Sequence, residues 1–201
     1  MLIPDIAIGC APGSEWAGRR RTSVLPAFPV ALEVSPAQAS IITETSGGKS
    51  GMPRKMDSVV ITTQFCARLN RLQPHSRARW GKMNSHQMVC HLVDTFRAVA
   101  GEKPVSSVVN LFGRTLLRWG ALHIPVPWPH GIPTRPEIAQ GVGGTPPALW
   151  ADDHAELHRR ITEFPRLEQF EQHPMMGTLS LDEWRIWGYR HVDHHFRQFG
   201  L

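Results

Sequence analysis

The sequence predicts an all-α fold for residues 56–201, and three observations support that prediction. Apolar residues recur at spacings of three and four along several segments, which is the pattern of helices with one buried face. Two of these segments begin with a capping box, in which paired side chains satisfy the free backbone groups of a first helical turn. A long connection rich in Pro and Gly separates the helices, which favours a bundle with a crossover.

Residues 1–55 differ from the rest of the chain in composition. They are rich in Pro, Gly, Ser, Thr and Ala and show no sustained periodicity, so we expect a disordered extension. An export signal over residues 1–39 is an alternative, because Arg19–Arg21 precede a mainly apolar stretch and an Ala-Gln-Ala sequence resembles a cleavage site. Two prolines and a glutamate interrupt that stretch, and a true start at Met52 or Met56 is a third interpretation.

Composition limits the classes of function and the compartment. The net charge of +5 is too small to indicate nucleic-acid binding, and the sequence has no run of about 18 apolar residues that would cross a membrane. Cys10, Cys66 and Cys90 are odd in number and form no CxxC motif, which argues against a disulfide framework and a thiolate zinc site. We therefore expect a cytoplasmic protein in which Cys66 and Cys90 are buried apolar residues.

The first predicted helix is short. Thr62 or Thr63 can cap it, and Pro74 lies just beyond its expected end at Leu72. The apolar positions that recur at helical spacing are Phe65, Cys66, Leu69 and Leu72.

The second predicted helix begins with a capping box formed by Asn84 and Gln87 and ends before Gly101. Its inward stripe comprises Met88, His91, Leu92, Thr95, Phe96 and Val99. His91 is therefore an interior histidine. Taken alone, it is most simply a core imidazole that is hydrogen-bonded to a neighbour.

Residues 106–122 are predicted to form a third helix, followed by a long connection over residues 124–147. The side chains available for burial on this helix are Val109, Leu111, Phe112, Leu116, Leu117 and Trp119. The connection contains seven prolines and four glycines. A segment of that length without its own helix is typical of a crossover between two neighbouring helices that run parallel.

Residues 148–164 are predicted to form the next helix, with Leu149, Trp150, His154, Leu157 and Ile161 on one face. His154 and His158 lie four residues apart, which is a spacing that permits metal chelation. Acidic and basic residues surround this pair, so a solvated face is the better interpretation.

The last helix carries the most informative residues. Ser180 and Glu183 form its capping box, and the inward stripe comprises Trp184, Trp187, Gly188, His191, His195 and Gln198. Residues four apart on a helix lie about 5–6 Å from each other between Cβ atoms, so His191 and His195 can chelate one ion. The pair is weak evidence alone in a chain with 11 histidines.

Three segments together carry a more specific resemblance. Residues 79–92 have the sequence RWGKMNSHQMVCHL, residues 173–177 are HPMMG, and residues 191–199 are HVDHHFRQF. In this order they resemble the DinB-like superfamily, and within it the domain-of-unknown-function type 1569 branch. The resemblance covers the chain from about residue 60 to its end.

This resemblance implies a DinB-like four-helix bundle with a long crossover and a divalent metal ion, with Zn or Ni expected. Carried over residue by residue, the ligands are His91, His191 and His195. His194 leans to the other side of the stripe, so its ligation is not favoured, although a spacing of three residues from His191 also permits chelation. His173 matches the family's His-Pro-x-x-Gly element, either lining the site or fixing its loop.

The activities implied by the resemblance are metal-dependent hydrolysis of a small-molecule substrate and transfer reactions that use a low-molecular-weight thiol. Three imidazoles leave coordination positions open, as in catalytic sites. We expect Asp94, His173, Asp193 or His194 to orient ligands or carry protons. Three alternatives stay open: a bundle stabilised by a non-catalytic metal, a small-ligand binding protein, and a helical interaction protein without metal. A homodimer is compatible with each of these alternatives.

Overall fold

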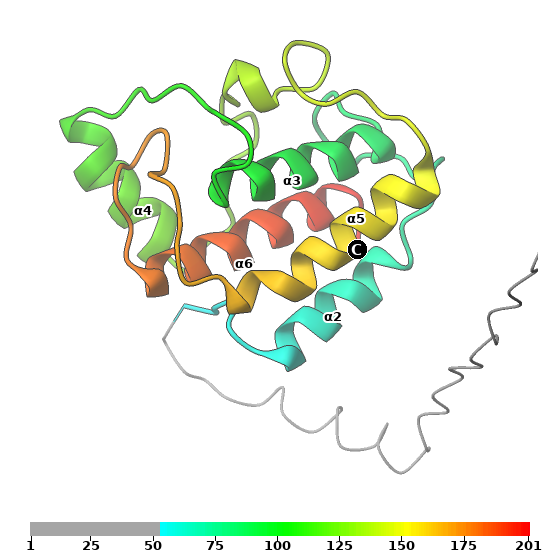
Figure 1. Cartoon of the computed structure of the whole chain (residues 1–201), viewed down its shortest axis with the longest axis horizontal. Coiled ribbons are helices and arrows are strands. Elements are labelled where there is room, and N and C mark those ends of the chain that lie inside the picture. Colours follow the sequence, from blue (N-terminus) through cyan, green and yellow to red (C-terminus); the bar gives the residue numbers. More distant parts are fainter. Residues whose placement is uncertain (1–52) are drawn as a thin grey trace, which may run out of the picture. The chain divides into compact units, whose positions relative to one another are not determined.

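The computed structural model describes residues 53–201, and this part of the chain contains five α-helices and no strand (Figure 1). The prediction of an all-α fold is thereby confirmed for these residues. Most of the predicted extension lies outside the described residues, together with the alternative signal segment and Cys10. Among the described residues, no helix has the length and hydropathy that a membrane span requires.

Four long helices surround a common core. They are α2 (Val59–Leu69), α3 (Ser85–Val99), α5 (Trp150–Glu163) and α6 (Leu181–Gln198). Helix α5 contacts both α3 and α2, and α2 also contacts α6. The largest side chains that are fully buried between them include Phe65, Leu69, Met88, Leu92, Leu157, Ile161, Trp184 and Phe196.

Both capping boxes form as the sequence predicts. The Asn84 side chain accepts a hydrogen bond from the Gln87 amide at 2.8 Å, and the Gln87 side chain accepts one from the Asn84 amide at 3.0 Å. Ser180 and Glu183 repeat this reciprocal pairing at the start of α6. Because two backbone donors are satisfied at each start, the residues at which α3 and α6 begin are well specified.

Helix α2 starts earlier and ends earlier than predicted. Its N-cap is Ser58, whose hydroxyl accepts from the Ile61 amide at 3.4 Å. The Thr62 hydroxyl instead donates to the Val59 carbonyl inside the helix at 3.0 Å. Ser and Thr are both competent caps, so the choice depends on the extended backbone at Ser58, which composition does not reveal.

The prediction for residues 106–122 is wrong in its start and in its burial. A π-helical turn, Gly113–Leu117, leads into the short helix α4, Arg118–His123, which packs on α6. Most of the apolar side chains expected in the core are exposed: Leu111 by 79%, Phe112 by 61%, Leu116 by 65% and Trp119 by 59%. Only one face of α4 meets α6, so the remaining apolar residues face solvent or a cavity.

The predicted crossover is present between α4 and α5. It contains a single 3-10 turn, Pro136–Ile138, among the described residues. Helices α3 and α5 are in contact and run in the same direction, which is the arrangement that a long return path permits (Figure 1). Helix α5 begins two residues later than predicted, and Leu149, which precedes it, is exposed rather than buried.

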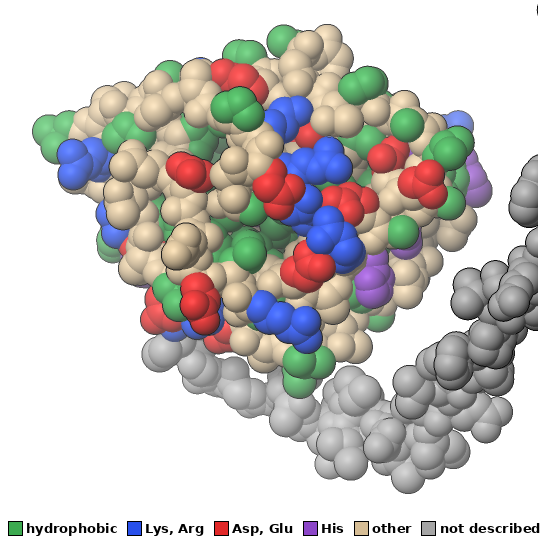
Figure 2. Space-filling view, in the orientation of Figure 1, with side chains coloured by type: hydrophobic (Ala, Val, Ile, Leu, Met, Phe, Trp, Pro, Cys, Tyr) green, Lys and Arg blue, Asp and Glu red, His purple; other side chains and the backbone are tan. Residues whose placement is uncertain are grey.

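The outer face of α5 is charged, as the sequence predicts. Arg159 and Arg160 both pair with Glu156, and Figure 2 shows acidic and basic side chains intermingled on this side of the molecule. His154 and His158 are only partly buried here. The His154 ring donates to the carbonyl of Leu69, so the pair does not converge on a common centre.

We predict that Gly188→Ala destabilises the fold. A Cβ atom at position 188 would lie 2.6 Å from Cε1 of Phe164, which is itself wedged between Phe96 and Phe170. Overpacking of this kind outweighs the gain in helix propensity, so the free energy of unfolding should fall by about 1–2 kcal/mol in urea titrations. Gly120→Ala is the control, because its nearest neighbour lies at 3.7 Å and the change should stabilise. An unchanged or raised stability of Gly188→Ala would contradict the prediction.

Candidate metal centre

Three histidines from two helices converge beside the core. His91 comes from α3, and His191 and His195 come from successive turns of α6. Their ring centroids lie 5.6 Å (His91–His191), 4.8 Å (His91–His195) and 4.9 Å (His191–His195) apart. One nitrogen of each ring lies within 4.8 Å of the other two, so the three could hold one metal ion.

His91 is held in one tautomer by the crossover. Its Nδ1 lies 2.9 Å from the carbonyl oxygen of Ile138, and a carbonyl only accepts, so Nδ1 carries the proton and donates. Burial lowers the pKa of His91, which keeps the ring neutral. The remaining nitrogen, Nε2, therefore has a free lone pair.

His195 is fixed in the same tautomer by a side chain. The Gln198 amide nitrogen donates to the Trp80 carbonyl at 2.8 Å, which turns its oxygen toward His195 Nδ1 at 3.0 Å. Nδ1 of His195 therefore donates, and Nε2 again has a free lone pair. Ligating histidines commonly have such a partner on the opposite nitrogen, because it orients the ring and raises its basicity.

His191 differs from the other two because both of its ring nitrogens are buried and have no hydrogen-bond partner among the described residues. An unsatisfied buried polar group costs about 1–3 kcal/mol. The pKa of His191 is well below its ordinary value, first through burial and then through His195 and His91. A cation would give one of these nitrogens a partner without protonating the ring, so the donor set fits a metal ion.

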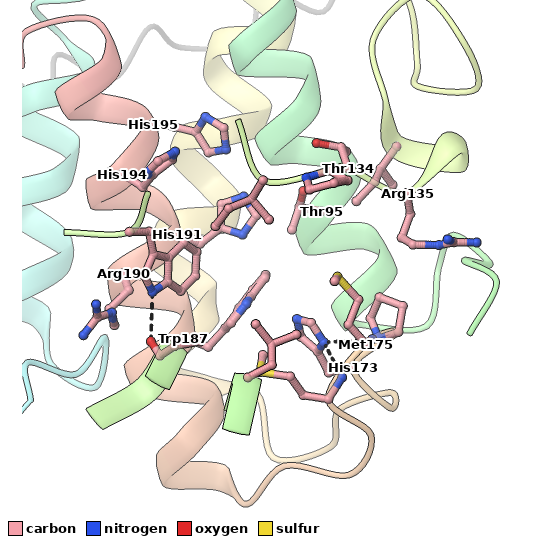
Figure 3. A pocket seen from close by; sticks show the side chains of 18 of the residues that line it. Thr95, Thr134, Arg135, His173, Met175, Trp187, Arg190, His191, His194 and His195 are labelled. Atoms are coloured by element: carbon pink, nitrogen blue, oxygen red, sulfur yellow. Dashed lines mark hydrogen bonds between the residues drawn. The ribbon is translucent and has the colours of Figure 1, made fainter. Parts of the chain in front are cut away.

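A cavity of about 1170 Å³ opens beside the three histidines (Figure 3). Its wall consists largely of apolar side chains, among them Trp80, Val99, Leu117, Trp128, Met175 and Trp187. His91, His191 and His195 also belong to this wall. A molecule in the cavity can therefore reach an ion bound by the cluster.

His173 also belongs to the cavity wall, in the loop that precedes α6. Its Nδ1 accepts hydrogen bonds from the amides of Met175 at 3.2 Å and Met176 at 3.1 Å, so the ring proton sits on Nε2. Burial lowers the pKa of His173 to about 4. Figure 3 shows the other edge of the ring facing the cavity. At neutral pH this residue is a hydrogen-bond donor rather than a base.

His194 lines the cavity but lies outside the group of three nitrogens. Its ring is half-buried among Trp80, Trp128 and His130, with centroids at 6.0, 6.0 and 6.4 Å. Burial and then the neighbouring His130 lower the pKa of His194. It is placed to contact a molecule in the cavity.

The two candidate carboxylates, Asp94 and Asp193, form hydrogen bonds and ion pairs away from the histidine cluster. Asp94 is fully buried outside the cavity wall, where it accepts from the amide and hydroxyl of Thr145, both at 2.6 Å, and pairs with Lys103 at 3.0 Å. Asp193 pairs with Arg68 at 2.8 Å. Asp94 thus attaches the crossover to α3, and its predicted part in catalysis stays a prediction.

A second group of potential ligands lies between α3 and α5. The His86 ring lies 2.8 Å from the Asp153 carboxylate, and the Cys90 thiol donates to the same carboxylate at 3.5 Å. Burial, and then the charge of Asp153, raise the pKa of Cys90 to about 12, so the thiol stays protonated. Each polar group here already has a partner. The prediction that Cys66 and Cys90 are buried is confirmed.

Sequence reasoning missed the partners of the ligating histidines. Gln198 was placed on the inward stripe without a role, although its position three residues after His195 made contact possible. The Ile138 carbonyl could not have been found, because a backbone acceptor has no residue-type signal. Trp80, whose ring stacks on His130 at 4.0 Å, was not recognised as part of the cavity wall.

Comparison of the chain with protein-family models, with curated proteins and with solved structures found no match in any of the three. The candidate site is therefore characterised by its own geometry.

We predict a pH dependence of stability that originates at His173. The unfolded chain protonates this residue near its ordinary pKa of 6.5 and the folded chain only near 4, so stability falls as the pH drops through that interval. With a chelator present, the native chain should lose about 2–3 kcal/mol more than His173→Asn between about pH 7 and about pH 4.5 in urea titrations. His75→Asn, at an exposed position, is the control. Equal pH dependence of the native and His173→Asn chains would refute this assignment.

Proposed function

We propose that the protein is a metal-dependent enzyme that acts on a small molecule in the cavity. His91 and His195 would bind a divalent ion through Nε2, and His191 through one of its ring nitrogens. The observation that carries this proposal is the pair of buried nitrogens of His191 that have no hydrogen-bond partner among the described residues. In His91 and His195, Nδ1 donates a hydrogen bond to an oxygen acceptor and Nε2 has a free lone pair. This is the state in which a histidine binds a metal ion.

The cavity supports an enzyme over a purely structural metal site. Structural sites are closed by four protein ligands, whereas three imidazoles next to an open space leave a position for water or substrate. A bound ion of this kind polarises a carbonyl group or lowers the pKa of a bound water toward about 7. The protein itself would orient the substrate through His173 and His194 and exclude bulk water with its apolar wall.

Membership of the DinB-like superfamily is part of this proposal. It is supported by the three sequence segments and by the close approach of His91, His191 and His195, the residues that the resemblance implies as ligands. On that basis the four long helices correspond to the DinB-like bundle. The reaction would be a hydrolysis or a transfer that uses a low-molecular-weight thiol, with Zn or Ni as the metal.

We expect the purified full chain to bind about one divalent ion per molecule. The double variant His91→Ala with His191→Ala should lose it, because one remaining imidazole cannot hold an ion at micromolar concentration. Metal content after gel filtration, measured by mass spectrometry, checks this. The matched control is His154→Ala with His158→Ala, which removes a histidine pair on α5. Stoichiometric metal in the His91/His191 variant would refute the proposed ligand set.

We predict that Gln198→Leu weakens metal binding about 10- to 100-fold, because His195 loses the acceptor that orients its ring. Gln198→Glu keeps an oxygen next to Nδ1 and should lose less. Competition with a fluorescent chelator measures both affinities. If Leu and Glu at this position weaken binding equally, or neither does, Gln198 does not act through His195.

A further inference from the structure

The cavity wall has few charges that a ligand could use. Five charged residues belong to this wall among those described, and two of them, Lys82 and Glu171, are exposed to solvent. Lys103 is neutralised by the buried Asp94 at 3.0 Å. Arg135 and Arg190 donate to backbone carbonyl groups at 3.1 and 2.6 Å. An anionic ligand would therefore have to compete with these carbonyl groups for the two guanidinium groups, or with Asp94 for Lys103, and a cationic ligand would find no unpaired carboxylate in the interior.

The rest of the interior is suited to apolar groups. Aromatic rings and methionine side chains cover the wall between the histidine cluster and His173, and Thr95 is one of the few uncharged polar side chains. Figure 3 shows the two ends of this space, with His191 on one side of Trp187 and His173 on the other. The Trp187 ring centroid lies 4.6 Å from that of His191 and 5.5 Å from that of His173.

His173 provides a fixed donor at the end away from the cluster. Two backbone amides hold its Nδ1, so the ring cannot rotate without losing both hydrogen bonds. The Nε2–H group then has a constant direction into an apolar space, where a hydrogen bond discriminates strongly between ligands with and without an acceptor.

We propose, on the basis of the metal centre put forward above, that the cavity binds an uncharged, elongated apolar molecule. Its metal-binding head reaches the three histidines, its body lies against Trp187, and a hydrogen-bond acceptor along the body meets the Nε2–H of His173. The volume of about 1170 Å³ is ample for such a molecule, since ligand sites commonly measure about 300–1,000 Å³. The substrate class is thus a hydrophobic compound rather than a charged metabolite.

The test uses the full chain loaded with Co²⁺ and three hydroxamic acids, with the visible absorption of cobalt as the readout. Octanohydroxamic acid should bind about a hundredfold or more tightly than acetohydroxamic acid, because each buried methylene contributes about fourfold. The analogue in which the terminal methyl is replaced by a carboxylate should lose most of that gain. Equal affinities of the short and long compounds, or no penalty for the carboxylate, would overturn the apolar assignment.

The same measurement separates this inference from the function on which it rests. If the cobalt spectrum responds to acetohydroxamic acid but the longer chain does not raise the affinity, the open metal site is supported and the apolar substrate class is refuted. Bound cobalt with no response to any hydroxamate overturns the open site, and this inference with it.

The role of His173 is tested with octanohydroxamic acids that carry one ketone at successive chain positions. One member should bind about three- to tenfold more tightly than the parent compound. His173→Asn should abolish this gain when the ketone and the parent compound are compared in the same variant, since Asn keeps an acceptor for the Met175 and Met176 amides but lacks the deeper donor. His173→Gln, which returns a donor at the Nε2 position, should restore it. Absence of a favoured ketone in the native chain, or its persistence in His173→Asn, would overturn this role.

Discussion

The histidine cluster depends on one constraint: the rings of His91, His191 and His195 stay neutral, and the nitrogens that face the cluster have no hydrogen-bond partner among the described residues. Burial disfavours the imidazolium form, and a single acceptor on the outer nitrogen of His91 and of His195 then decides the tautomer. His191 has no such partner in the described part of the chain. Burying both nitrogens of His191 without a partner has a cost, and a coordinated cation would remove the part that falls on the ligating nitrogen.

Helix α3 and the crossover are held together next to the histidine cluster by contacts from two residues of one helical turn. Asp94 lies three residues after His91 and fastens Thr145, which keeps the crossover against α3. The same crossover supplies the Ile138 carbonyl that orients His91. One turn of α3 thus carries both His91 and Asp94, and Asp94 anchors the segment that orients His91.

The sequence predicted those parts of the fold in which local chemistry and periodicity agree. The capping boxes at Asn84 and Ser180 gave the starts of α3 and α6, and the stripes that follow them placed His91, His191 and His195 inward. The start of α2 was missed because several hydroxyl residues could cap it. The apolar residues 111–119 were assigned to the core because periodicity does not distinguish a core from a cavity wall, which Phe112 and Leu116 line, or from an exposed face, where Leu111 and Trp119 lie. Backbone acceptors such as that of Ile138 follow from tertiary structure alone.

The carboxamide of Gln198 has a wider consequence. It bridges the Trp80 carbonyl and the His195 ring, and Trp80, which lines the cavity, stacks on His130. One side chain thus connects the cavity lining with the histidine cluster. Under the proposed metal site, a bound molecule that shifts the backbone at Trp80 would disturb the acceptor that fixes the His195 tautomer, so that occupancy of the cavity and retention of the ion would be coupled.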